Sequence, residues 1–148
     1  MEFIAHLHTK IIHFPIAFLM LYCIIEFIFL LTKNDFLNKN AFLFLGVGVV
    51  GAFFAVLSGN QAFAIIKQWS DYSRELFNTH QTYANITVWY FTALLILRYF
   101  LFIKKKLNQK TIFILLFLAL IGGYFVYQTG NYGGKFAHQY YKSDNLSN

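Results

Sequence analysis

The chain has 148 residues, of which 58% are hydrophobic and only 12% are charged. A soluble domain carries about 25% charged residues, so this composition excludes an ordinary water-soluble fold and indicates a protein that exposes apolar surface to a lipid bilayer. The formal net charge of +6 comes from lysines and arginines that are not interleaved with a nucleic-acid recognition motif, and no nucleic-acid partner is expected.

Four apolar segments follow one another, each near the roughly 20 residues that a helix needs to cross a bilayer. They cover residues 11–32, 41–66, 83–103 and 111–128. The links at 33–40 and 104–110 are short, which makes successive spans antiparallel neighbours. We therefore predict an all-α membrane protein: a single domain over residues 1–148 that forms an up-down bundle of four transmembrane helices, with a polar, frayed tail at 143–148.

The first span opens on HLHTKIIHFPIA, residues 6–17, which places three histidines just before the only proline of the chain. Pro15 lacks an N–H and disfavours helical geometry at the residue before it, so the span is expected to begin near Phe14, with His13 at its cap. In a continuous helix His8 and His13 point about 140° apart. Partners for these imidazoles are therefore expected from other spans.

The second span carries Gly51, Ala55 and Gly59 at four-residue spacing, a smooth stripe on which another helix or a flat macrocycle could lie. Three polar residues that could orient an imidazole follow in the same layer as the histidines: Ser58, Asn60 and Gln61.

The later histidines fall at the same end of the bundle as the first three. His80 opens the third span and His138 follows the fourth. Between the fourth span and His138, the glycines Gly130, Gly133 and Gly134 permit a tight turn, which would return His138 toward the other imidazoles.

Basic residues define the orientation. They concentrate on the links at 33–40 and 104–110, above all in the run Lys104–Lys106. By the positive-inside rule these links face the cytoplasm. We expect a multi-pass protein of the bacterial inner membrane with both termini on the periplasmic side.

Two charges lie well inside the spans. Glu26 lies 15 residues after Ile11, and Arg98 lies 15 residues after Tyr83. At about 1.5 Å per residue they reach a similar depth, so a structural ion pair between the first and third spans is the simplest interpretation.

Imidazoles in this layer suit a cofactor, because neutral histidine ligates haem iron and transition metals. Two imidazoles from facing helices make a site for haem b, and no C-x-x-C-H motif for covalent haem is present. We expect the axial ligands to be two of His13, His80 and His138, with His8 in reserve and His6 least favoured. A zinc or copper site built from His8, His13, His80 and His138 is the alternative.

Several of these stretches resemble the bacterial membrane family catalogued as domain of unknown function 2231. They are LHTKIIHFPIA (7–17), SGNQA (58–62), His80 and TGNYGGKFAH (129–138). The chain departs from the family at Thr9, where proline is usual, and at His138, where many members have tyrosine. The resemblance implies a four-span, redox-associated membrane protein, since a subgroup with histidine at the position of His138 is associated with fusions to cytochrome c modules.

The expected function is that of a membrane-embedded electron-transfer protein with b-type haem, an electron carrier or redox subunit rather than a stand-alone enzyme. Expected partners are the lipid bilayer and a quinol or a cytochrome c-type redox protein, and a homo-oligomer remains open. The rival interpretation is a non-catalytic accessory or structural membrane subunit whose histidines only line the membrane interface.

Overall fold

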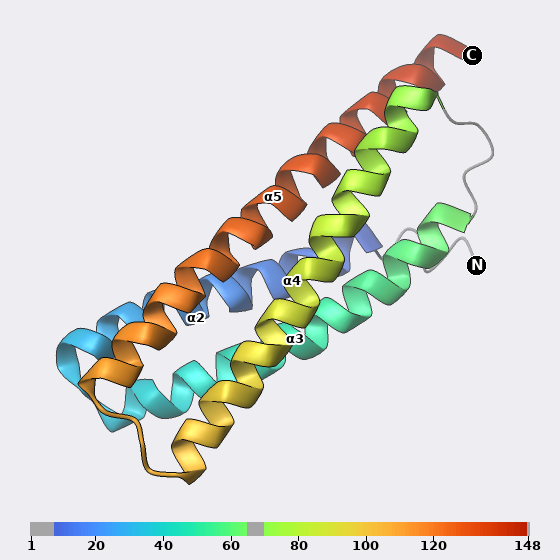
Figure 1. Cartoon of the computed structure of the whole chain (residues 1–148). Coiled ribbons are helices and arrows are strands. Elements are labelled where there is room, and N and C mark those ends of the chain that lie inside the picture. The colour runs from blue at the N-terminus through green and yellow to red at the C-terminus, as the bar shows by residue number, and fades with distance from the viewer. Residues whose placement is uncertain (1–7, 65–69, 148) are drawn as a thin grey trace.

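The protein forms a bundle of four long helices. The structure, a computed structural model, describes residues 8–64 and 70–147, so His6 and the predicted end of the second span at Ile66 lie outside the described residues. The helices are α2 (His13–Thr32), α3 (Asp35–Ala64), α4 (Asp71–Ile103) and α5 (Gln109–Ser147). Consecutive helices run in opposite directions (Figure 1). The predicted all-α four-helix architecture is therefore confirmed for the described part of the chain.

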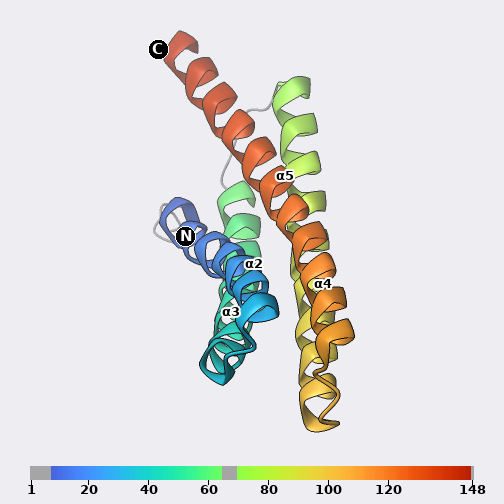
Figure 2. The ribbon, with the colours of Figure 1, turned by 90° about the vertical axis from the view of Figure 1, so that its left-hand side faces the viewer.

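The bundle is built from two hairpins. Helix α2 packs along α3, and α4 packs along α5, while α2·α5 and α3·α4 contacts join the two hairpins. Figure 2 shows the hairpins side by side. Both short links lie at one end of the bundle, which we call the loop end; residue 8 and the last turns of α5 lie toward the other end, which we call the terminal end (Figure 1).

The links at the loop end are closed by local hydrogen bonds. Lys33 adopts a left-handed backbone conformation with φ of 52°, and its N–H donates to the Phe29 carbonyl at 2.8 Å, which ends α2. The Asn34 side-chain oxygen then accepts the Phe36 N–H at 2.8 Å and starts α3. Since α3 already begins at Asp35, the first link is shorter than the predicted 33–40.

Pro15 lies inside the first turn of α2 rather than at its boundary. Residues 8–11 are also helical, and the helix is interrupted only at Ile12, the N-cap of α2, which has no side-chain capping bond. His13 is therefore the first residue of α2 and not the cap that the sequence predicted. A proline is tolerated there because the first N–H groups of a helix have no partner within it.

Helices α4 and α5 extend beyond the predicted spans. Helix α4 begins at Asp71, where the Ser70 hydroxyl caps it by accepting the Ser73 N–H at 3.1 Å, twelve residues before the predicted start at Tyr83. Hydropathy detects only the part of a helix inside the hydrocarbon, whereas helix α5, with 39 residues, is about 58 Å long against a hydrocarbon core of about 30 Å.

The predicted turn after the fourth span is not found. Helix α5 continues through Gly130, Gly133 and Gly134 to Ser147, and none of the nine glycines, all of which are described, has a positive φ. The turn prediction is wrong because a glycine permits such a turn without requiring it. No proline follows these glycines to stop the helix.

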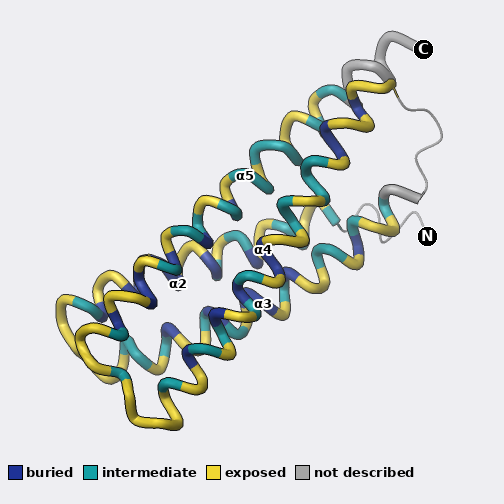
Figure 3. The backbone as a smooth tube through the Cα atoms, in the orientation of Figure 1, coloured by how far each residue is buried: buried dark blue, intermediate teal, exposed yellow. Residues whose placement is uncertain are grey.

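The core is narrow and the outer surface is apolar. Fully buried side chains from all four helices meet along the axis: Leu19, Tyr22, Leu45, Phe91 and Leu115. Large apolar residues such as Leu31, Trp89 and Phe113 are exposed around the outside, where yellow dominates in Figure 3. All four helices are long and apolar enough to cross a membrane by length and composition. This surface is therefore the one that lipid covers.

Candidate cofactor site at the terminal end

His8 and His80 lie at the same level of the bundle. His80 is 23 residues before the end of α4, and His8 is 24 residues before the end of α2, so each is about 35 Å from the loop end along its helix. One histidine belongs to each hairpin.

The imidazole of His8 is held by two consecutive residues of α3. Its Nδ1 lies 2.9 Å from the Ser58 hydroxyl oxygen, and that hydroxyl donates its own proton to the Ala55 carbonyl at 3.0 Å. Since the hydroxyl proton is already used, Nδ1–H of His8 is the donor to Ser58. A Cβ on Gly59 would lie 3.0 Å from the His8 Cε1, so glycine is what admits the ring.

The imidazole of His80 is held in the same way by α5. Its Nδ1 lies 2.9 Å from the carbonyl oxygen of Thr129, which can only accept, so Nδ1–H of His80 is the donor. A Cβ on Gly133 would lie 3.0 Å from both Cε1 and Nδ1 of His80. Below this contact, the hydroxyls of Thr87 and Thr129 are 3.1 Å apart and tie α4 to α5.

Both rings therefore direct Nδ1–H toward the neighbouring helix of their own hairpin. No hydrogen bond to either Nε2 is found among residues 8–64 and 70–147. A metal-ligating histidine typically donates its other N–H to a carbonyl or a neighbouring side chain, which fixes the tautomer and the ring orientation. This donor chemistry fits two axial ligands of a haem.

The other two predicted ligands lie elsewhere. His13 is exposed on the first turn of α2, about 7.5 Å deeper than His8 along the helix. His138 is exposed nine residues beyond Thr129, about 13 Å farther along α5, where it lines a polar groove with Tyr72 and Lys135. The structure thus places His8 and His80 at one level of the bundle, each held by the neighbouring helix, and places His13 and His138 at other levels.

The described residues do not group three or more ligands for zinc or copper. In the described ranges no group of three or more His, Cys, Asp or Glu side chains could hold a metal ion. Zinc needs three or four protein ligands, whereas haem iron needs only two axial ones because the macrocycle supplies the rest.

The two interior charges meet in the lower half of the bundle. Arg98 and Glu26 form an ion pair between α4 and α2, and their side chains are 1% and 0% exposed. Arg98 Nη2 also donates to the Asn38 side-chain oxygen at 2.8 Å. The guanidinium lies 5.8 Å from the centre of the Tyr22 ring. The pair therefore joins three helices near the loop end, far from the histidines.

Sequence reasoning found Ser58 as an imidazole partner but missed three residues. The Thr129 carbonyl and Asn38 carry no signal in a single sequence, because a backbone acceptor and a link residue look ordinary. Gly133 did carry a signal in the sequence. It follows Thr129 by one helical turn, and because it has no side chain it leaves space for a ring beside the Thr129 carbonyl.

Four apolar helices with charged groups paired inside define a polytopic helical membrane protein. The chain matches the family model described as "Predicted membrane protein (DUF2231)" over residues 5–142. This protein therefore belongs to that family. No curated protein and no solved structure shows a significant match to the chain.

Adjacent glycines on α5 allow a matched test of the ring contact. We expect Gly133→Ala to destabilise the protein by about 1–3 kcal/mol, because the added Cβ presses on the His80 ring. A Cβ on Gly134 meets nothing within 4 Å, so Gly134→Ala should stabilise α5 by about 0.5–1 kcal/mol. Thermal unfolding in detergent measures both. Equal effects of the two substitutions would contradict the close packing of His80 against α5.

Proposed function

We propose that this protein is a membrane-embedded electron-transfer protein that binds b-type haem through His8 and His80. The observation that carries the proposal is the matched pair of Nδ1 contacts, 2.9 Å each, to Ser58 and to the Thr129 carbonyl. From these contacts we derive that each imidazole donates Nδ1–H to its neighbouring helix and keeps Nε2 for a ligand. Two such rings at one level, one on each hairpin, support a site in which both imidazoles would hold the haem iron.

The residues around the two imidazoles would hold these rings in position and would not react themselves. Ser58 and the Thr129 carbonyl fix the ring planes and raise the basicity of Nε2. Gly59 and Gly133 leave the space that lets each ring lie against its helix. When bound, a haem supplies one-electron transfer at the iron. His8 replaces His13 and His138 as the partner of His80 in this proposal.

Orientation and partners extend the proposal. Lysines at the loop end favour a bacterial inner-membrane protein with the terminal end periplasmic, where a cytochrome c-type protein or a quinol could exchange electrons with it. A cysteine placed at Lys135 should then react with an impermeant thiol reagent in intact spheroplasts. Reaction only after cell lysis would show that the terminal end faces the cytoplasm instead.

The direct test is the optical spectrum of detergent-purified protein after expression with added haem precursor. We expect a Soret band and sharp visible bands of low-spin iron on reduction, because two imidazoles make a strong axial field. Iron in stoichiometric amount by elemental analysis should accompany the spectrum. A folded protein with neither haem nor iron would contradict the proposal and favour an accessory membrane subunit.

A further inference from the structure

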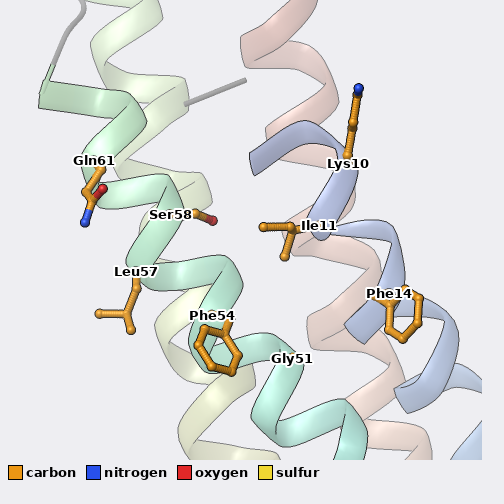
Figure 4. A pocket seen from close by; sticks show the side chains of 8 residues that line it. All are labelled: Lys10, Ile11, Phe14, Gly51, Phe54, Leu57, Ser58 and Gln61. Carbon is orange, nitrogen blue, oxygen red and sulfur yellow. The ribbon is translucent and has the colours of Figure 1, made fainter. Parts of the chain in front are cut away.

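A groove runs between the first turns of the chain and α3 at the terminal end. It has a volume of about 590 Å³. Residues from the two arms of the first hairpin line it: Lys10, Ile11, Phe14, Gly51, Phe54, Leu57, Ser58 and Gln61. Figure 4 shows Lys10 and Gln61 at one end of it and Phe14, Phe54 and Gly51 at the other. The volume lies in the range of about 300–1,000 Å³ that holds small ligands.

The dimensions of the groove match one leaflet of a bilayer. From Gly51 to Gln61 the wall on α3 spans ten residues, or about 15 Å along the axis, which is half of a hydrocarbon core of about 30 Å. The walls along this length are apolar, formed by Ile11, Phe14 and Phe54. An occupant with a hydrocarbon chain of about one leaflet's length would remove this surface from contact with disordered lipid.

The polar end of the groove carries a positive charge. Lys10 is the one charged residue in its lining, and it is exposed. It directly precedes the predicted start of the first span at Ile11, so we place it at the level of the lipid headgroups. A lysine near the membrane surface attracts anionic lipids. The hydroxyl of Ser58 is engaged by His8 and by the Ala55 carbonyl. The Lys10 ammonium and the Gln61 amide are the other polar groups of the lining, and of these only Lys10 carries a charge that distinguishes an anionic headgroup from a neutral one.

We infer that this groove binds one acyl chain of an anionic phospholipid, with the phosphate beside Lys10. The inference combines a leaflet-long apolar wall with a single cation at its headgroup end. It does not depend on the haem proposal, because neither His8 nor His80 lines the groove.

The test is native mass spectrometry of the detergent-purified full chain with added phosphatidylglycerol or phosphatidylcholine of identical acyl chains. The wild type should retain one phosphatidylglycerol in preference to phosphatidylcholine. Leu57→Trp, which fills the groove, should weaken this binding about tenfold. Leu120→Trp is the matched control on α5, because both leucines are 59% exposed and either substitution is therefore tolerated at the surface. Lys10→Gln should reduce the preference for the anionic lipid about fivefold, and Lys135→Gln should leave it unchanged.

Four results would overturn the inference. They are equal retention of the two lipids by the wild type, equal losses in the two tryptophan variants, and release by Leu57→Trp of a co-purified isoprenoid quinone instead of a phospholipid. The fourth is a dimer in the wild type that Leu57→Trp dissociates, since the groove would then be covered by a second copy of the chain.

Discussion

Replacing His8 or His80 with alanine should abolish the low-spin haem spectrum, while His13→Ala and His138→Ala should retain it. Either substitution of the first pair removes an axial ligand, and the remaining imidazole would leave the iron five-coordinate and high-spin or unbound. The second pair is exposed and lies about 7.5 Å and about 13 Å along the helices from the His8 and Thr129 positions. Titration of purified apoprotein with haemin, followed at the Soret band, measures all four variants.

The series has two internal controls. Ser58→Ala removes the acceptor of His8 Nδ1–H but not the ligand, so haem affinity should fall by about 10–100-fold with the low-spin spectrum preserved. Added imidazole should restore low-spin iron to the glycine variants His8→Gly and His80→Gly. Loss of the spectrum in His13→Ala or His138→Ala, with His8→Ala unaffected, would show that the ligands are those the sequence alone favoured.

Removing one partner of the buried ion pair should be the most destabilising change in the bundle. Arg98→Leu leaves the Glu26 carboxylate buried without its cation, and the expected cost is about 3–5 kcal/mol in the free energy of unfolding. The double variant Glu26→Leu/Arg98→Leu should recover much of this loss, because no uncompensated charge remains. Unfolding in mixed micelles of mild detergent and dodecyl sulfate, followed by circular dichroism, measures each variant.

An exposed pair of charged residues provides the comparison. Arg74 and Glu75 are both exposed near the start of α4, and Arg74→Leu or Glu75→Leu should change stability by less than about 1 kcal/mol. If Arg98→Leu were equally mild, or if the double variant were as unstable as the single one, the pair would not carry the stability assigned to it. In that case the Asn38 contact or the Tyr22 ring would account for the burial of Arg98.

The ion pair and the two histidines lie toward opposite ends of the bundle and connect the helices differently. Near the loop end, Glu26 and Arg98 join α2 to α4, with Asn38 of α3 as a third partner. Near the terminal end, each imidazole instead bonds within its own hairpin, His8 to Ser58 and His80 to Thr129. A cofactor between the histidines would therefore supply a link between the hairpins that the two rings do not make themselves.

The sequence by itself determined the four-helix membrane architecture, the end of the bundle at which the histidines lie and the depth of Glu26 and Arg98. These properties follow from hydrophobic runs and from a rise of about 1.5 Å per residue, which are local and additive along the chain. Ser58 was also found this way, because it lies in the same layer as the histidines.

Only the tertiary structure decided which histidines share a level of the bundle and are held by a neighbouring helix. That choice depends on helix rotation and on where α5 ends, and neither is encoded in a run of apolar residues. The glycines Gly130, Gly133 and Gly134 are compatible both with a turn and with a continuous helix. In the structure α5 is continuous and His80 packs against Gly133. The continuous helix places His138 farther along α5, away from His80. The choice of His8 over His13 likewise depends on Gly59, whose missing side chain admits one particular ring.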